Sequence, residues 1–194
     1  MTEQKSTRER ILDSALNIFS RKGYHDTKVD EIVSDSHTSK GSIYLHFPNK
    51  EKLFLALVDQ FADLIERNVR DSIEQEAGIE RVRVALESVL NTFAKYRRPA
   101  KLLLVQAVGL GTVFENKRME VMDRFAELIR IYLQEAIELG DIAPVDNVDV
   151  VSHAWMGAIY SVVTHWVYTG EPDKAVIIGT LLPLLLKSVG YEAK

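Results

Sequence analysis

The chain has 194 residues, of which 46% are hydrophobic, and a formal net charge of −4 at pH 7. This composition is typical of a globular protein rather than a disordered one, and the length suits one compact domain or a small domain followed by a larger one. The chain contains no cysteine, which excludes disulfides, thiolate metal sites and cysteine nucleophiles.

The N-terminal segment begins polar, without the apolar core of a signal peptide, and then becomes an amphipathic helix. Ser6 and Glu9 have the spacing of a capping box, which predicts a helix start at Ser6 or Thr7, and Gly23 is a good C-terminal stop. The apolar stripe that this helix would bury consists of Ile11, Leu12, Ala15, Leu16 and Phe19. Since no run of 18 apolar residues follows anywhere, we expect a cytoplasmic protein with no membrane span.

Two short helices joined by a tight corner are predicted next in the chain. A helix over 27–35 is indicated by Thr27 as its N-cap, with Asp30 closing a capping box, and a helix over 40–46 is indicated by Ser39 as its N-cap. Their inward positions are apolar at helical spacing: Val29, Ile32, Val33, Ile43 and Phe47. Two helices joined in this way form a helix-turn-helix, whose second helix can enter the DNA major groove. The alternative is an ordinary corner in an all-α domain.

The residues that this motif turns outward suit contacts with DNA. Lys40 can donate to guanine, Leu45 can touch a thymine methyl, and Gly41 lets the backbone approach the duplex. Tyr44, Lys50 and the amides at a helix start at Asn49 can hold phosphate. The residues predicted to contact DNA are Thr27, Lys28, Thr38, Ser39, Lys40, Gly41, Ser42, Tyr44, Leu45, His46 and Lys50.

Residues 8–58 resemble the N-terminal domain of the tetracycline-repressor (TetR) family of bacterial transcription regulators. The matching positions, in fixed order, are Ile11, Ala15, Phe19, Gly23, Tyr24, Thr27, Ile32, Ser39, Lys40, Gly41, Ser42, Ile43, Tyr44, Phe47, Asn49, Lys50 and Leu53. The resemblance implies a dimeric DNA-binding repressor whose remaining helices bind a small ligand.

The turn departs from the family pattern. Where the family usually has Ala-Gly followed by an apolar residue, this chain has Ser36, His37 and Thr38. Glycine is favoured where φ is positive, and histidine is among the better tolerated replacements. We therefore expect either a less stable motif or a turn that makes its own contact with DNA.

Charge is distributed unevenly along the chain. Residues 1–50 carry eight Lys/Arg and seven Asp/Glu, a net charge of +1, whereas residues 51–194 carry sixteen and twenty-one, a net charge of −5. This asymmetry is consistent with docking on DNA through the N-terminal part, although it gives only weak support.

The rest of the chain predicts further helices and no strands, so the expected fold is all-α. It comprises an N-terminal three-helix helix-turn-helix DNA-binding domain over 1–52 and a larger helical effector-binding and dimerisation domain over 53–194. Helices are expected at 51–75, 80–95, 116–139, 148–169 and 173–189. The segment 101–114 is apolar almost all round and should be buried.

The last two helices are candidates for a homodimer interface. Helix 173–189, with Pro183 expected to kink it, has more apolar residues than one buried stripe needs, so it is either central in its own fold or shared with a partner. The resemblance implies that helices 148–169 and 173–189 of each subunit form a four-helix interface. Two-fold symmetry would then place two recognition helices on a pseudo-palindromic operator.

Large apolar side chains with sparse polar ones suggest a small-molecule cavity. The candidate ligand-binding residues are Tyr96, Leu103, Gln106, Phe114, Phe125, Trp155, Met156 and Tyr160. The same pattern also fits an ordinary core. Some family members that control fatty-acid metabolism bind long acyl-CoA, which suggests a hydrophobic effector with Arg97, Arg98 or Lys101 near its phosphates. A drug-like or aromatic effector is the alternative. Either ligand would act by shifting helix 51–75.

Two other classes of function compete with a DNA-binding regulator. A helical enzyme is disfavoured because His153 and His165 lie twelve residues apart rather than four, and because no phosphate-binding glycine loop or Gly-x-Ser-x-Gly elbow occurs. We expect no catalytic residue, metal or cofactor. An all-α dimeric interaction protein without specific DNA binding would require Lys40, Tyr44 and Lys50 to be incidental.

Overall fold

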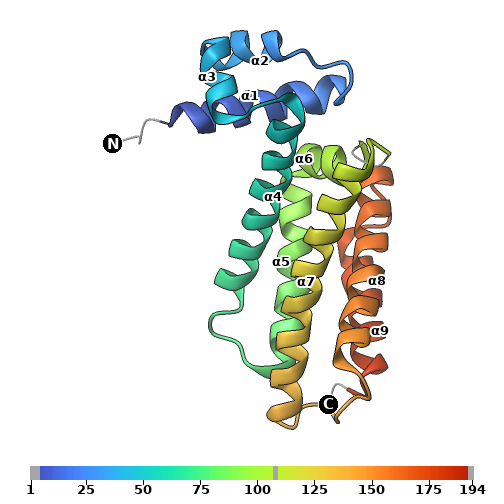
Figure 1. Ribbon diagram of the computed structural model, residues 1–194. Helices are drawn as coiled ribbons and strands as arrows, with labels where there is room; N and C mark the ends of the chain where they lie inside the picture. Colours follow the sequence, from blue (N-terminus) through green and yellow to red (C-terminus); the bar gives the residue numbers. More distant parts are fainter. Residues whose placement is uncertain (1–4, 107–108, 192–194) are drawn as a thin grey trace. The chain divides into compact units, whose positions relative to one another are not determined.

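The computed structural model describes residues 5–106 and 109–191, which form helices and contain no β-strand (Figure 1). The all-α prediction is therefore confirmed. In chain order the elements are α1 (Thr7–Lys22), α2 (Val29–Ser36), α3 (Lys40–His46), α4 (Lys50–Ser72), α5 (Gly78–Lys95), α6 (Arg97–Lys101), the π-helix η1 (Leu102–Gln106), α7 (Thr112–Glu138), α8 (Val148–Thr169) and α9 (Lys174–Ser188). None of the described helices is long and apolar enough to cross a membrane.

Most helix bounds fall close to those predicted, and α8 has the predicted bounds. The segment 101–114 differs from the expectation of a wholly buried stretch. It changes from α6 to the π-helix, and the backbone turns at Gly109 and Gly111, whose φ angles are +81° and +113°. Leu102 and Phe114 are buried, whereas both glycines are exposed. The positive φ angles at these two positions are incompatible with right-handed helical geometry.

The described residues pack as two compact units. The first, here called the head, comprises those within 1–62 and 98–117; the second, the body, comprises those within 63–97 and 118–194. The head is thus built from two separate stretches of chain. The functional boundary after residue 52, between a DNA-binding and an effector-binding domain, stays a prediction.

The head has one hydrophobic core. The apolar stripe of α1 is buried as predicted, with Ile11, Leu12, Ala15 and Phe19 fully inaccessible, and the short helices α2 and α3 pack on it (Figure 1). Leu102 and Phe114, from the second stretch of chain, belong to the same core.

An aromatic cluster joins the two stretches of the head. The ring of Phe114 meets Tyr24 edge to face at 5.1 Å between centroids and Phe54 at 5.4 Å, and Phe54 meets Phe19 at 5.4 Å. Edge-to-face contacts at such distances are favourable because the positive edge of one ring faces the negative face of the other. The start of α7 is therefore a structural part of the head.

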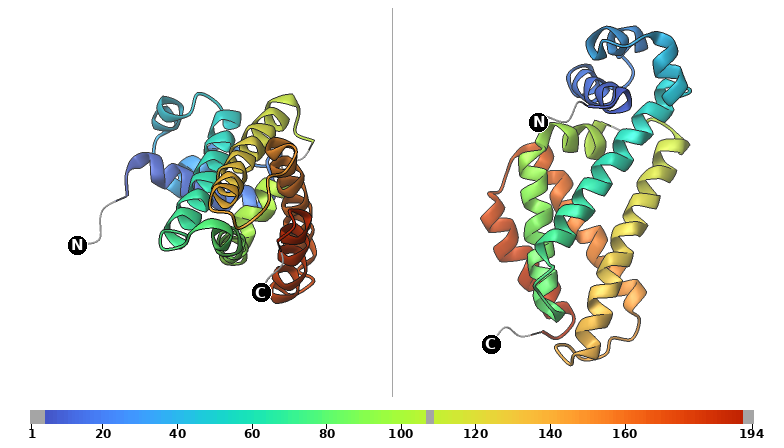
Figure 2. Two further views of the ribbon diagram at one scale, coloured as in Figure 1. Left: turned by 90° about the horizontal axis from the view of Figure 1, so that it is seen from below. Right: turned by 90° about the vertical axis from the view of Figure 1, so that its left-hand side faces the viewer.

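In the body, α8 and α9 lie side by side and both pack on α5 (Figure 2). Trp155 is buried between α8 and α9, and its Nε1 donates to the hydroxyl of Ser188 at 3.0 Å. The guanidinium of Arg97 donates to the carbonyl of Trp166 at 3.4 Å, at the C-terminal end of α8. A cation is favourable there because the last carbonyls of a helix carry partial negative charge.

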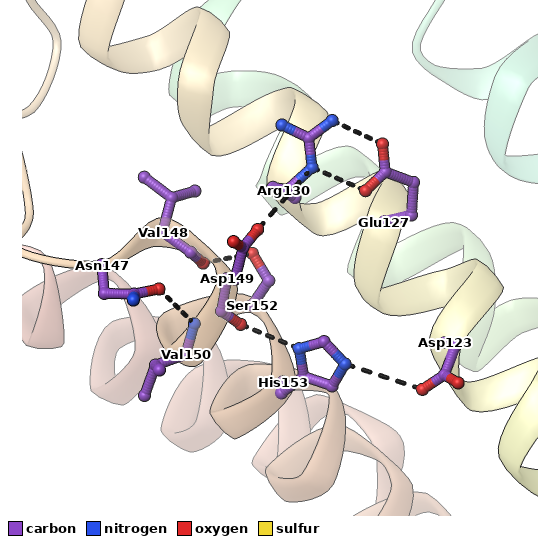
Figure 3. Close-up of polar contacts among 9 residues, drawn as sticks. All are labelled: Asp123, Glu127, Arg130, Asn147, Val148, Asp149, Val150, Ser152 and His153. Carbon is purple, nitrogen blue, oxygen red and sulfur yellow. Dashed lines mark hydrogen bonds and ion pairs between the residues drawn. The ribbon is translucent and has the colours of Figure 1, made fainter.

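A chain of polar side chains connects α7 to the start of α8 (Figure 3). His153 Nδ1 lies 2.8 Å from the carbonyl oxygen of Asp149, which can only accept, so Nδ1 carries a proton; Nε2 lies 3.6 Å from the carboxylate of Asp123. Arg130 binds Glu127 with Nε–Oε2 of 2.6 Å and reaches Asp149 at 3.9 Å. His153 is thus an exposed residue with polar partners.

Candidate nucleic-acid interface

The corner between α2 and α3 is a left-handed turn centred on His37. Its φ and ψ are 51° and 44°, and the next amide, of Thr38, donates to the carbonyl of Val33 at 3.3 Å. The expectation of a positive φ at the position where the family usually has glycine is confirmed. Histidine adopts this conformation at a cost, since an L side chain there crowds the backbone.

Two hydroxyls occupy the inner side of this turn. Ser36 is buried; its Oγ donates to the carbonyl of Ile32 at 2.6 Å and lies 2.8 Å from Oγ1 of Thr38. Since the single hydrogen of Ser36 goes to the carbonyl, Thr38 donates to Ser36. The departure from the family pattern therefore forms a hydrogen-bonded pair of hydroxyls. The Thr38 hydroxyl would have only acceptor sites left for a contact with DNA, which stays a prediction.

Helix α3 is positioned by its cap and its buried face. The hydroxyl of Ser39 accepts from the amide of Ser42 at 3.0 Å, as predicted, while Ile43 and Phe47 are buried. Asn49 caps α4 by accepting from the amide of Lys52 at 2.8 Å, also as predicted.

The opposite face of α3 is open. The exposed residues on it are Lys40, Gly41, Tyr44, Leu45 and His46, and Leu45 is 83% exposed. A Cβ on Gly41 would meet only the Ser39 hydroxyl, at 3.9 Å. A short helix that presents a lysine, a glycine, a tyrosine and an exposed leucine on one face has the features needed to read a DNA groove.

The start of α2 differs from the prediction. Thr27 is buried, and its hydroxyl donates to the carbonyl of Gly23 at 2.7 Å instead of capping the helix. The helix begins at Val29, and the carboxylate that bonds back to its start is that of Glu31, which accepts from the amide of Lys28 at 3.1 Å. The predicted Thr27–Asp30 capping box is therefore wrong, because Thr27 is held by the preceding loop.

Asp30 instead pairs with the recognition helix. Its Oδ1 lies 2.7 Å from Nζ of Lys40, and this hydrogen bond raises the pKa of the Lys40 ammonium. The two residues lie on different helices, and no periodic pattern links them, so sequence reasoning missed the pair.

Lys50 makes contacts within the head that the sequence did not predict. Its ammonium donates to the carbonyls of Tyr24, His25 and Thr27 at 2.9, 3.3 and 3.0 Å and lies 4.5 Å from the centroid of the Tyr24 ring. An ammonium has three donors, and all three are used here. Lys50 thus fastens the loop before α2, and a phosphate would have to displace one of these bonds.

The candidate ligand residues do not all gather in one place. Leu103 and Phe114 belong to the head core, whereas Tyr96, Phe125, Trp155, Met156 and Tyr160 lie in the body. Phe114 is a core residue of the head, and its contact with a ligand stays a prediction. The side chain of Gln106 lies outside the described residues. Whether the body residues contact an effector stays a prediction.

Taken together, a left-handed corner, a capped second helix and an open polar face define a helix-turn-helix DNA-binding protein. Residues 11–57 match the family model described as bacterial regulatory proteins, tetR family. Residues 11–57 therefore form a DNA-binding domain like that of the TetR regulators, and the chain is a DNA-binding transcriptional regulator.

Similar proteins over nearly the whole chain are also regulators. The fatty acid metabolism regulator protein of Bacillus subtilis is 23% identical over 191 residues, which cover 97% of this chain and 98% of that protein. The regulator UidR of Escherichia coli K12 is 29% identical over 167 residues, covering 83% and 82%. The crystal structure of FadR from Bacillus subtilis in complex with stearoyl-CoA has a TM-score of 0.81 at 23% identity and covers 95% of this chain and 99% of that one. These names support a regulatory rather than an enzymatic role.

Proposed function

We propose that this regulator is a homodimeric repressor that binds an inverted-repeat operator and is released from it by a long-chain fatty acyl-CoA. The observation that carries the effector class is the full-length likeness to a fatty acid metabolism regulator and to a regulator crystallised with stearoyl-CoA. DNA would be read by α3, one copy from each subunit.

Exposed faces on the last two helices support self-association. On α8 a subset of the exposed residues recurs at helical spacing, and on α9 a subset of the exposed residues recurs every four residues. These residues are Val150, Ala154, Ser161, His165 and Tyr168 on α8, and Val176, Thr180 and Leu184 on α9. Val150, Tyr168, Val176 and Leu184 are each more than half exposed. A two-fold axis places the same patch of both subunits face to face, which would cover these side chains.

The second stretch of the head offers a route from effector to DNA. Leu102 and Phe114 are fixed in the head core, and between them the chain contains a π-helix and two glycines at positive φ. A ligand that reorganised the chain between these two residues would act directly on the packing beneath α1 and α4. Such a ligand must bind the DNA-incompetent state more tightly, because a ligand with equal affinity for both states changes nothing.

Two cations on α6 are candidates to bind the phosphates of the effector. Arg98 and Lys101 are exposed on α6, next to the apolar π-helix. Arg97, the third cation of this stretch, is instead engaged with the C-terminal end of α8. We assign phosphate binding to Arg98 and Lys101 because both are exposed beside the apolar π-helix.

The first test is selection of genomic DNA fragments by the purified protein at two salt concentrations. An enriched inverted repeat that persists at the higher salt concentration is expected from a dimeric sequence reader. Weak enrichment that disappears with salt would indicate nonspecific phosphate binding and would contradict the proposal.

The dimer is tested with Leu184→Glu in α9, measured by light scattering after size exclusion. Leu139→Glu is a matched control, because Leu139 is 59% and Leu184 is 62% exposed. The proposal expects a dimer for the parent and the control and a monomer for Leu184→Glu. Dimers in all three would exclude α9 from the interface.

The effector is tested by titrating stearoyl-CoA, octanoyl-CoA, free CoA and stearate into the complex with the selected duplex. Stearoyl-CoA should release the DNA at the lowest concentration, and Arg98→Ala with Lys101→Ala should weaken that release. Saturating binding of stearoyl-CoA without loss of DNA affinity would refute the switch.

A further inference from the structure

An acidic side chain is paired with a lysine on the open face of α3. Asp30 is the second residue of α2 and Lys40 the first of α3, and their side chains meet at 2.7 Å while remaining 70% and 55% exposed. A carboxylate on a DNA-binding surface is unfavourable for nonspecific affinity because it faces phosphates. Its position therefore requires a reason.

The pair contributes little to folding. An exposed ion pair adds little stability, since water screens it and both side chains lose freedom. Asp30 is also outside the head core, and the carboxylate that bonds back to the start of α2 belongs to Glu31. Replacing Asp30 should thus leave the fold intact and change only what happens on DNA.

The geometry of an ammonium suggests what Asp30 does. Lysine is a flexible point charge that can satisfy any phosphate within reach. An ammonium has three donors, so one can remain on Asp30 while two are left for the O6 and N7 acceptors of guanine. If Lys40 moves toward a phosphate, its ion pair with Asp30 breaks. The carboxylate of Asp30 is then left without a partner beside the negatively charged DNA backbone, which is unfavourable.

We propose that Asp30 is a specificity-determining residue that acts by positioning Lys40 toward a base and by opposing its use on the backbone. The inference rests on the proposed base-reading role of Lys40. It makes Asp30 a residue that lowers total DNA affinity while raising the preference for the correct sequence.

The test compares Asp30→Asn with Asp13→Asn. Asp13 pairs with Lys5 at 2.7 Å, has a side chain that is 45% exposed and lies in the same compact unit, so both variants remove one negative charge and one lysine partner. Affinities are measured over a series of salt concentrations for the duplex enriched by the parent protein and for a shuffled duplex of the same composition. Thermal midpoints serve as the folding control.

For Asp30→Asn we expect affinity for the shuffled duplex to rise about fivefold, with the slope of log K against log salt steeper by about 0.9 per bound chain. Affinity for the enriched duplex should change less than about twofold, so the specificity ratio falls by a factor of about three to five. Asp13→Asn should leave the ratio unchanged. Equal changes of the specificity ratio in the two variants would mean that only the net charge matters, and this would overturn the proposal.

Lys40→Ala completes the design. In the Lys40→Ala background, Asp30→Asn should no longer alter the specificity ratio, because the carboxylate has nothing to position. An effect that persists in this background would show that Asp30 acts alone and would also overturn the proposal. If Lys40→Ala by itself leaves the enriched duplex bound as tightly as before, Lys40 does not read a base. This result distinguishes a wrong role for Lys40 from a wrong role for Asp30.

Discussion

Phe114→Ala should destabilise the head, although Phe114 lies 60 residues after Phe54 in the chain. The side chain is 7% exposed and meets two aromatic rings at 5.1 and 5.4 Å. Truncation of a buried phenylalanine costs about 3–5 kcal/mol because transfer free energy is lost and a cavity remains. We expect about 4 kcal/mol, a large part of the roughly 5–15 kcal/mol that stabilises a typical protein.

Urea unfolding gives the free energy, and hydrogen exchange locates the effect. Amide protection in α1 should fall by about a thousandfold, since each 1.4 kcal/mol is about a factor of ten. Phe125→Ala is the control, because Phe125 is only half-buried and lies in the body; it should leave α1 protected. Phe114→Leu should restore most of the stability. A loss below about 1 kcal/mol for Phe114→Ala, or unchanged protection in α1, would refute the assignment of Phe114 to the head core.

Three further predictions concern the head. Lys50→Met should lower the free energy of unfolding in urea by about 2 kcal/mol, because three carbonyls lose a charged donor. Lys52→Met, at an exposed site, should lower it by less than about 0.5 kcal/mol. Equal losses in the two variants would contradict the structural role of Lys50. His37→Val should lower the free energy of unfolding by about 1–2 kcal/mol, because a β-branched residue tolerates a φ of +51° poorly. His37→Gly should be at least as stable as the parent. Equal thermal midpoints for the valine and glycine variants would contradict backbone strain at position 37. The ion pair with Lys22, and then a backbone amide, lower the pKa of Glu31 below its usual 4.5, so its contribution is present above pH 4.5 and is lost as pH falls through the lowered value. Glu31→Gln should therefore flatten the acid dependence of the urea midpoint below about pH 4.5, and an unchanged slope would rule this out.

Features set by neighbouring residues were predictable from the sequence. The caps at Ser6, Ser39 and Asn49 depend on a side chain and an amide three residues away, and each was found where the spacing placed it. The bounds of α8 follow from local signals too, with Asn147 at its start and Gly170 at its end. Such contacts form whenever the helix forms, so sequence spacing is enough to find them.

Features that depend on distant residues were missed or misassigned. Thr27 has a good capping side chain, but the loop that Lys50 fastens places its hydroxyl on Gly23 instead. Phe114 looks like a cavity residue because the sequence around it is apolar, and only the tertiary packing shows that Tyr24 and Phe54 surround it. The sequence shows whether a side chain is apolar or polar, whereas the tertiary structure decides which residues it contacts.

The discontinuous head has a consequence for synthesis on the ribosome. Domains generally fold as units, N-terminal ones first, while the chain is being made. Here the helix-turn-helix emerges early, but its core lacks Leu102 and Phe114 until the start of α7 has also left the exit tunnel. The DNA-reading part therefore reaches its full stability only after α5 and α6 have been translated. A chimera that takes residues 1–62 from this chain should also take residues 98–117, because the first stretch alone would expose the faces of Tyr24 and Phe54 that Phe114 covers.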